Sequence, residues 1–231
     1  IATQGVMSQL ELLDENTVYV GAGVPGAKLA RFCVKHGLAG AEFFAGIPGL
    51  VGGALAMNAG AFGSETWPLV VEVETLNRQG EVFRRKADEF KYGYRHVEGP
   101  ADEWFISATL RLEKQTAENE SSDNQAIDIK QLLNKRAATQ PTGVASCGSV
   151  FRNPEGDYAA RLIEACGLKG KRIGGAVISE KHANFIINDK EATASDIESL
   201  IKLIQATVEE KFGVTLQPEA WIVGDVLEMK E

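Results

Sequence analysis

The sequence contains no apolar run that approaches the roughly 20 residues needed for a membrane-spanning helix. It also lacks the pattern of a signal peptide, and it has no excess of basic residues, since its formal net charge is −8. Proteins that bind nucleic acids normally carry a basic surface, so this balance argues against that class. An anionic small molecule stays compatible, because a cationic pocket can form in an acidic protein. We therefore expect a cytoplasmic monomer without nucleic-acid or membrane partners.

Cysteine and histidine are scarce. The three cysteines, Cys33, Cys147 and Cys166, are odd in number, lie far apart in the sequence and match no zinc-site spacing. The three histidines do not gather into a group that suggests a metal site either. We therefore expect reduced thiols, as in the cytosol, and no bound metal.

The chain does contain enough apolar sequence to fold. Apolar residues make up 44% of its 231 residues, and this length suits one large or two small domains. The stretch 113–126 is polar and poor in large apolar side chains, so it is the best candidate for a domain boundary. The chain begins abruptly at Ile1 rather than at Met, so we expect the natural protein to continue upstream.

Residue patterns predict a mixture of strands and helices. Ser195 and Glu198 form a capping-box pattern before an amphipathic stripe that reaches Gly213, and Asp157 is a candidate N-cap. Strands are expected at 17–20, 70–75, 80–84, 104–112, 173–178, 183–187 and 214–223, and helices at 25–36, 127–138, 157–166 and from 195 to 212. This order favours an α+β fold over a regular βαβ array.

One segment fits the dinucleotide-binding fingerprint G-x-G-x-x-G. Residues 21–26 read Gly-Ala-Gly-Val-Pro-Gly, and Glu42 lies near the spacing of a ribose-binding acid. The chain then runs into Gly-Ile-Pro-Gly at 46–49, where a parallel sheet would need further strands and helices. We therefore interpret 21–26 as a tight turn from strand to helix whose glycines adopt positive φ.

A second glycine-rich segment, 46–63, contains six glycines and one proline. Without side chains, its backbone N–H groups could approach a phosphate or the edge of a flat ring. Close packing of a short helix on a sheet explains the same composition equally well. The residues alone leave these two interpretations open.

Three further motifs place reactive side chain types beside turn residues. They are Tyr94-Arg95, Gly-Ser-Val-Phe-Arg-Asn-Pro at 148–154, and Pro218-Glu219. An arginine can pair with a carboxylate through two hydrogen bonds, and a positioned serine hydroxyl can donate a proton to developing negative charge. Taken singly, Ser149 is more often a turn residue, and Arg95 and Glu219 are more often exposed surface groups.

Taken together and in this order, the motifs resemble the UDP-N-acetylenolpyruvoylglucosamine reductase family, in its shorter form, from about residue 18 to residue 224. The resemblance implies part of a two-subdomain FAD-binding fold of the vanillyl-alcohol-oxidase type, followed by a C-terminal α/β substrate-binding domain. It divides the chain into an FAD-binding domain at 1–118, a linker and helix at 119–140, a substrate-binding domain at 141–213, and a strand at 214–231 that returns to the FAD domain.

The implied activity belongs to peptidoglycan precursor synthesis. NADPH reduces FAD, and reduced FAD reduces UDP-N-acetylglucosamine-enolpyruvate to UDP-N-acetylmuramate. The family's first pyrophosphate-binding loop falls upstream of Ile1, so an inactive chain that binds FAD weakly or not at all is an alternative expectation.

The resemblance also implies residue roles. Ser149 is the proton donor, Arg95 holds the enolpyruvyl carboxylate, and Glu219 completes the catalytic set. Contacts to FAD are implied for Gly46, Ile47, Pro48, Gly49, Gly52, Gly53, Ala54, Asn58 and Gly60. Substrate contacts are expected for Tyr94 and Asn153, and, on the positive charge that a diphosphate needs, for Arg152, Arg136 and Lys169.

Two other classes of protein remain open from the sequence. One is a different FAD-dependent oxidoreductase of the same fold, acting on another substrate. The other is a catalytically inactive binding module, in which the segment 46–63 only packs.

The sequence Ala220-Trp221 after Glu219 departs from the family's usual aliphatic and basic pair, which affects the surroundings of Glu219.

Overall fold

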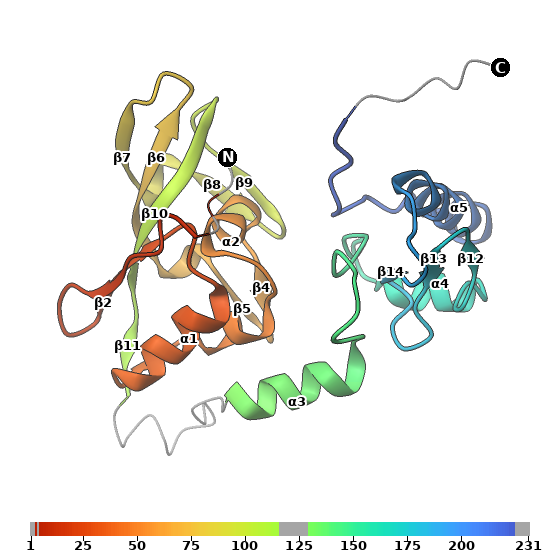
Figure 1. Cartoon of the computed structure of the whole chain (residues 1–231), viewed down its shortest axis with the longest axis horizontal. Helices are drawn as coiled ribbons and strands as arrows, with labels where there is room; N and C mark the ends of the chain where they lie inside the picture. Colours follow the sequence, from red (N-terminus) through yellow and green to blue (C-terminus); the bar gives the residue numbers. More distant parts are fainter. Residues whose placement is uncertain (1–2, 4, 116–128, 225–231) are drawn as a thin grey trace. The chain divides into compact units, whose positions relative to one another are not determined.

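The computed structural model describes residues 3, 5–115 and 129–224, and it divides into two compact units, Ile1–Arg136 and Ala137–Glu231. Both units mix helices with antiparallel sheet, which confirms the α+β class (Figure 1). The expected linker at 119–140 lies partly outside the described residues. Among the helices that the structure describes, none has the length and apolar character that crossing a membrane requires.

The first unit is built on a five-stranded antiparallel sheet in the order β1-β2-β10-β6-β7. Its strands are β1 (Leu10–Leu12), β2 (Thr17–Gly21), β10 (Glu103–Arg111), β6 (Val70–Asn77) and β7 (Val82–Lys86). Val18, Val20, Ala108 and Leu110 place apolar side chains in the core, as expected for a sheet with one buried face. The predicted strands at 17–20, 70–75, 80–84 and 104–112 are confirmed.

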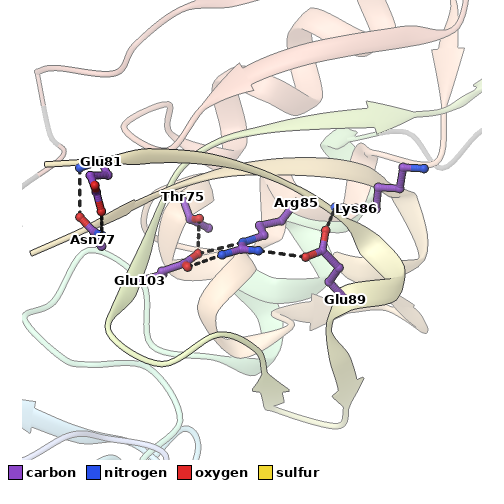
Figure 2. A network of polar contacts seen from close by, with 7 residues as sticks. All are labelled: Thr75, Asn77, Glu81, Arg85, Lys86, Glu89 and Glu103. Carbon is purple, nitrogen blue, oxygen red and sulfur yellow. Dashed lines mark hydrogen bonds and ion pairs between the residues drawn. The ribbon is translucent and has the colours of Figure 1, made fainter. Parts of the chain in front are cut away.

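The turn between β6 and β7 is fixed by Asn77, as Figure 2 shows. The amide N–H of Gly80, at φ +85°, donates to the Asn77 carbonyl at 3.2 Å. The Asn77 side chain accepts from the amide of Glu81 at 3.0 Å and donates to its carboxylate at 2.7 Å. The turn between the two predicted strands therefore forms through local side-chain bonds.

Helix α1 (Gly26–Lys35) follows Pro25 and buries Leu29, Ala30 and Cys33 against the core. Gly37 lies just past its end at φ +67°, a conformation that favours glycine. The remaining elements of this unit are β3 (Leu38–Ala39), η1 (Glu42–Gly46), α2 (Val51–Met57), β4 (Gly60–Ala61), β5 (Ser64–Glu65), η2 (Trp67–Leu69), η3 (Ala87–Glu89), β8 (Lys91–Gly93), β9 (His96–Glu98) and β11 (Glu113–Lys114).

The antiparallel sheet is incompatible with a Rossmann domain, whose strands are parallel. The predicted reason for the glycines at 21–26 is nevertheless wrong, because Gly21 and Gly23 do not adopt positive φ. A Cβ at Gly21 would lie 2.0 Å from the Met7 carbonyl oxygen, and one at Gly23 would lie 2.0 Å from that of Val6. These glycines instead allow the backbone near residues 6–7 to approach closely.

The second unit joins two helices to a small antiparallel sheet, β12-β13-β14. Helix α3 (Ile129–Thr139) crosses the division between the units, and α4 (Ala159–Ala165) and α5 (Ala194–Phe212) follow. Residues 173–178 do not form the single strand that we expected. Gly174 and Gly175 make a turn between β12 (Arg172–Ile173) and β13 (Ala176–Ile178), and β14 (Ile186–Asn188) completes the sheet.

The N-cap of helix α5 lies two residues before the predicted one. Thr193 is the N-cap, its hydroxyl accepts from the amide of Asp196 at 3.1 Å, and the Asp196 carboxylate accepts from the amide of Thr193 at 2.9 Å. The capping box is therefore Thr193/Asp196, and the Ser195/Glu198 prediction is wrong. Gly213 ends the helix at φ 67°, as predicted.

The strand predicted at 214–223 does not form within the described residues. Leu216 is buried in the core of the second unit, and Pro218 makes a single β-bridge to Phe151. Trp221 is 79% exposed. Proline explains the interruption, because it cannot donate to a strand ladder.

Candidate active site

Two residues at the start of α2, within the glycine-rich segment 46–63, are hydrogen-bonded to the loop between β2 and α1. The Val51 amide donates to the Val24 carbonyl and the Gly52 amide donates to the Ala22 carbonyl, both at 2.9 Å. Two N–H groups expected to face a phosphate are therefore engaged inside the fold. This anchoring fixes where α2 starts.

Close packing explains three of the glycines in this segment. A Cβ at Gly46 would lie 2.6 Å from the Phe62 ring, and one at Gly60 would lie 2.5 Å from the Ser64 carbonyl oxygen. At Gly52 it would lie 3.0 Å from the Cβ of Ala22. The packing interpretation thus holds for these three residues.

Gly53 differs from them, because a Cβ added to this residue would meet no atom within 4 Å. Gly52 and Gly53 line a pocket of about 220 Å³ together with Ala56, Trp104 and Phe105. Bare backbone facing two aromatic residues suits a flat ring, so the chain's residues fit part of a flavin here. Of the other expected FAD contacts, Ile47 is half-buried, Pro48 and Gly49 are exposed, and Ala54 is buried in the core.

Figure 2 shows a polar network that includes Glu103, a residue that also lines this pocket. Arg85 on β7 holds the carboxylate of Glu103 on β10 through bonds of 2.6 Å from Nη2 and 3.2 Å from Nε. Thr75 on β6 donates its hydroxyl to the same carboxylate, and Arg85 also donates to Glu89 at 3.2 Å. The bond from Arg85 lowers the pKa of Glu103, so this wall of the pocket carries a fixed anion.

Arg95 occupies the turn of the β8–β9 hairpin. Gly93 pairs with His96, so Tyr94 and Arg95 are the two turn residues, and Arg95 has φ 54°. Its Nη2 donates to the Gly60 carbonyl at 2.8 Å. Its guanidinium also lies 5.2 Å from the centre of the Tyr94 ring. The expected carboxylate-binding arginine is therefore attached to the glycine-rich segment.

Asn58, expected to contact FAD, is completely buried at the end of α2. Its amide nitrogen donates to the Gly93 carbonyl at 3.0 Å and to the Glu65 carboxylate at 2.9 Å. Its amide oxygen accepts from the Trp67 N–H at 3.0 Å. The side chain thus links α2, η2 and β8.

Ser149 lies in a loop of the second unit whose next residue, Val150, is hydrogen-bonded on both sides. Gly148 precedes Ser149 at φ +84°, and the Val150 amide donates to the Asn184 carbonyl at 2.9 Å. The Ser149 side chain is half-buried, and it makes no hydrogen bond to any residue that the structure describes. The turn-serine alternative, which needs such a bond, is therefore not observed.

Glu219 lies beside this segment. Its amide donates to the Val150 carbonyl at 2.7 Å, and the Arg152 amide donates to the Gln217 carbonyl at 2.9 Å. The structure therefore brings together two of the three expected catalytic residues, Ser149 and Glu219, on neighbouring stretches of one unit. Arg95 belongs to the other unit.

Asn184 is a residue that the sequence interpretation left without a role. It is 3% exposed, its side-chain oxygen accepts from the Phe151 amide at 2.9 Å, and its nitrogen donates to the Phe151 carbonyl at 2.8 Å. These two bonds give the backbone of Phe151, which follows Ser149-Val150, the partners that a neighbouring strand would otherwise supply. The only signal in the sequence is the stretch His182-Ala-Asn-Phe, which gives no hint of this contact.

The residues expected to bind substrate have different surroundings. The Asn153 side chain accepts from the amide of Ala159, the first residue of α4, at 3.1 Å, and the observed N-cap is Tyr158 in place of the predicted Asp157. The Nε of Arg152 is buried without a hydrogen-bond partner among the described residues. Lys169 pairs with Glu164 at 2.8 Å. Arg136 lies in the last turn of α3, and Tyr94 is 49% exposed.

Comparisons with known proteins place both units. Residues 1–85 match the model of an FAD binding domain, and residues 140–223 match that of the UDP-N-acetylenolpyruvoylglucosamine reductase C-terminal domain. The chain is thus an FAD-dependent oxidoreductase.

Curated relatives and a solved structure agree with this assignment. The chain is 56% identical to UDP-N-acetylenolpyruvoylglucosamine reductase of Legionella pneumophila (strain Corby), over 97% of this chain and 72% of the relative. It is also 56% identical to the reductase of Alkalilimnicola ehrlichii, over 97% and 74%. The crystal structure of the reductase from Thermus caldophilus matches at a TM-score of 0.76 with 32% identity, covering 92% of this chain and 73% of that one. The chain belongs to the UDP-N-acetylenolpyruvoylglucosamine reductase family.

Proposed function

We propose that this protein reduces the enolpyruvyl double bond of UDP-N-acetylglucosamine-enolpyruvate and so produces UDP-N-acetylmuramate for peptidoglycan, in the cytoplasm, with NADPH as reductant. The observation that carries the proposal is the pairing of the segment that bears Ser149 with the segment that bears Glu219. Both segments lie in the domain that matches the family's C-terminal model.

FAD, when bound, supplies hydride transfer from NADPH to the substrate. The glycine face at Gly52 and Gly53, opposite Trp104 and Phe105, is where the residues of this chain fit its flat ring. The Glu103 carboxylate at the edge of the pocket stays ionised because Arg85 holds it, so it acts as a fixed charge and not as a proton donor.

Ser149 supplies the proton that completes the reduction. Hydride addition to the double bond leaves carbanion-like charge on the neighbouring substrate carbon, and a hydroxyl donates there only when it is positioned against that charge. The bonds of Val150 to Asn184 and Glu219 hold the backbone next to Ser149 from both sides. Its hydroxyl has no other bond to a described residue that would compete with the transfer.

Arg95 binds the enolpyruvyl carboxylate and stabilises negative charge as it develops. A guanidinium has five N–H donors, and the carbonyls of Gly60 and Asn58, at 2.8 Å and 3.5 Å, orient two of its nitrogens. Glu219 completes the catalytic set and orients the substrate. Tyr94, Arg152, Asn153, Arg136 and Lys169 are the proposed contacts to the UDP-sugar, and Arg152 contributes an Nε that is buried and unpartnered among the described residues.

The test follows the fate of the substrate. The purified protein is incubated with FAD, NADPH and UDP-N-acetylglucosamine-enolpyruvate, and the nucleotide sugar is analysed by mass spectrometry. We expect a product that has gained two hydrogen atoms, formed in step with NADPH oxidation. With oxygen excluded, UDP-N-acetylglucosamine, which lacks the enolpyruvyl group, should cause no NADPH oxidation beyond the one equivalent that reduces the FAD. An unchanged substrate mass, or equal NADPH consumption with both sugars, contradicts the proposal.

A further inference from the structure

Both hydrogen-bond donors of the Asn58 side chain are used inside the fold, and burial keeps its oxygen away from a ligand. Asn58 is fully buried, both donors of its amide nitrogen are used by Gly93 and Glu65, and its oxygen accepts from Trp67. A buried amide that gave up these bonds to reach a cofactor would leave several polar groups unpaired, which is costly. Asn58 therefore contributes to the site through the backbone groups that its hydrogen bonds and its conformation fix in place.

The first of these groups is the hairpin that carries Arg95. The Asn58 side chain bonds the Gly93 carbonyl, two residues before Arg95. Arg95 adopts φ 54°, a region that residues other than glycine rarely occupy and that persists only where the surroundings hold it. The bond to Gly93 fixes the start of that turn.

The second group is the backbone that receives the guanidinium. Asn58 ends α2 with φ 44° and ψ 53°, a left-handed conformation that asparagine tolerates better than most residues. This conformation turns the chain so that the carbonyls of Asn58 and Gly60 accept from Arg95 at 3.5 Å and 2.8 Å. Asn58 therefore acts on Arg95 at two places, through its side chain and through its backbone.

A third contact strengthens the link to α2. Trp67, whose N–H is bonded by Asn58, donates its indole N–H to the Leu55 carbonyl of α2 at 2.8 Å. Its ring stacks on Tyr92 of β8 at 5.6 Å. Asn58 thus connects helix α2, which carries Gly52 and Gly53 of the FAD pocket, to the β8–β9 hairpin, which carries Arg95.

We propose that Asn58 is a positioning residue, which fixes the Arg95 guanidinium relative to helix α2 and thereby sets the distance between the bound flavin and the substrate carboxylate. The inference rests on the proposed function. A positioning role and a direct contact to the cofactor have different consequences. If Asn58 positions Arg95, its loss should impair the reoxidation of reduced FAD by the enolpyruvyl substrate, which uses the carboxylate. The reduction of FAD by NADPH, which does not use it, should be spared.

Two variants disrupt the side-chain bonds of Asn58 in different ways. Asn58→Gly keeps the left-handed backbone but removes the amide, and Asn58→Asp keeps the size but places an acceptor against Gly93 and Glu65. Asn77→Gly is the matched control, because the Asn77 side chain bonds only within its own turn among the described residues. Thermal unfolding of each variant, measured first, identifies any that fails to fold.

Stopped-flow absorbance then measures the two half-reactions separately. For Asn58→Gly, we expect unchanged FAD reduction by NADPH and about 100-fold slower reoxidation by the enolpyruvyl substrate, a loss typical of a misplaced binding group. Asn58→Asp should behave alike, and Asn77→Gly should leave both rates unchanged. In an Arg95→Ala background, Asn58→Gly should slow reoxidation no further, because both changes remove one interaction.

Binding measured by calorimetry without FAD gives a second readout. UDP-N-acetylmuramate carries the carboxylate and UDP-N-acetylglucosamine does not, so we expect Asn58→Gly to weaken only the former, by about tenfold, as for the loss of roughly one interaction. Loss of FAD, equal slowing of both half-reactions, or additivity with Arg95→Ala overturns the inference while the proposed function stands. Wild-type protein whose reduced flavin is not reoxidised by the substrate overturns the proposed function, and this inference with it.

Discussion

The amide N–H of Glu219 donates a 2.7 Å hydrogen bond to the carbonyl of Val150. Val150 directly follows Ser149, and the β-bridge between Phe151 and Pro218 continues the pairing. Two proposed catalytic residues are thus held on adjacent backbones within one unit. Their spacing is set by backbone bonds and not by the flexible ends of their side chains.

Replacing Ser149 with alanine removes the proposed proton donor. We expect reoxidation of reduced FAD by the enolpyruvyl substrate to slow by about 10²–10⁴-fold, the range for losing a general acid, with FAD reduction by NADPH unchanged. Stopped-flow absorbance at the flavin bands measures both rates. Ser146→Ala, at an exposed serine of the same segment, is the control and should behave like the wild type. If Ser149→Ala reoxidises at the wild-type rate, Ser149 is not the donor.

Replacing Asn184 with alanine leaves the N–H and the C=O of buried Phe151 without partners. Each such group costs roughly 1–3 kcal/mol, so we expect the free energy of unfolding to fall by about 3 kcal/mol. Urea denaturation monitored by circular dichroism measures this change. Asn188→Ala is the matched control: its oxygen accepts from the Ala192 amide on an exposed surface, so it should cost about 1 kcal/mol. Equal losses in both variants would show that the bonds to Phe151 are unimportant.

The two overlapping capping patterns before α5 make opposite predictions. In the structure Thr193 is the N-cap, so Thr193→Ala should lower the free energy of unfolding by about 1 kcal/mol. Ser195 lies inside the first turn, so Ser195→Ala should change it little, since alanine is the better helix former. Urea denaturation of both variants checks the order. A larger loss for Ser195→Ala would restore the cap predicted from the sequence.

The ion pair between Asp157 and Arg161 gives a pH dependence. The bond from Arg161 and the bond from the Tyr158 amide lower the pKa of Asp157 from 3.8 to about 2. A carboxyl whose folded pKa is depressed stabilises the fold above its unfolded pKa, and this contribution is lost as the pH falls through the folded value. The stability difference between wild type and Asp157→Asn should therefore be constant above about pH 5 and vanish between about pH 4 and pH 2.

An NMR titration of the Asp157 carboxyl checks this directly. A midpoint near the ordinary value for aspartate, or a stability difference that persists at pH 2, would show that the pair does not form in solution. Because the Asp157 side chain is 27% exposed and its partner Arg161 54% exposed, added salt should weaken the effect.

Local patterns predicted the fold best where neighbouring residues decide the structure. The turn at Asn77 and the helix end at Gly213 follow from side-chain bonds and backbone preferences within a few residues. The start of α5 was missed because Thr193-x-x-Asp196 and Ser195-x-x-Glu198 both satisfy the capping rule. A one-dimensional pattern does not choose between them.

Contacts between distant residues explain what the sequence could not predict. Motifs identified the segments of Ser149 and Glu219, but their pairing joins residues almost seventy positions apart. Asn58 was expected to touch FAD, whereas its partner Gly93 lies 35 residues away, and Asn184 bonds Phe151 over 33 residues. In the sequence, Asn58 and Asn184 cannot be distinguished from other polar residues, because their hydrogen-bond partners are known only from the fold.

The most direct test of the account is a visible absorption spectrum of the purified protein with FAD, recorded without oxygen after removal of unbound flavin. The account predicts retained flavin bands that NADPH bleaches and that UDP-N-acetylglucosamine-enolpyruvate restores, while UDP-N-acetylglucosamine does not. Bands that NADPH bleaches but the enolpyruvyl substrate leaves bleached would contradict it, as would a protein that retains no flavin at its full natural length.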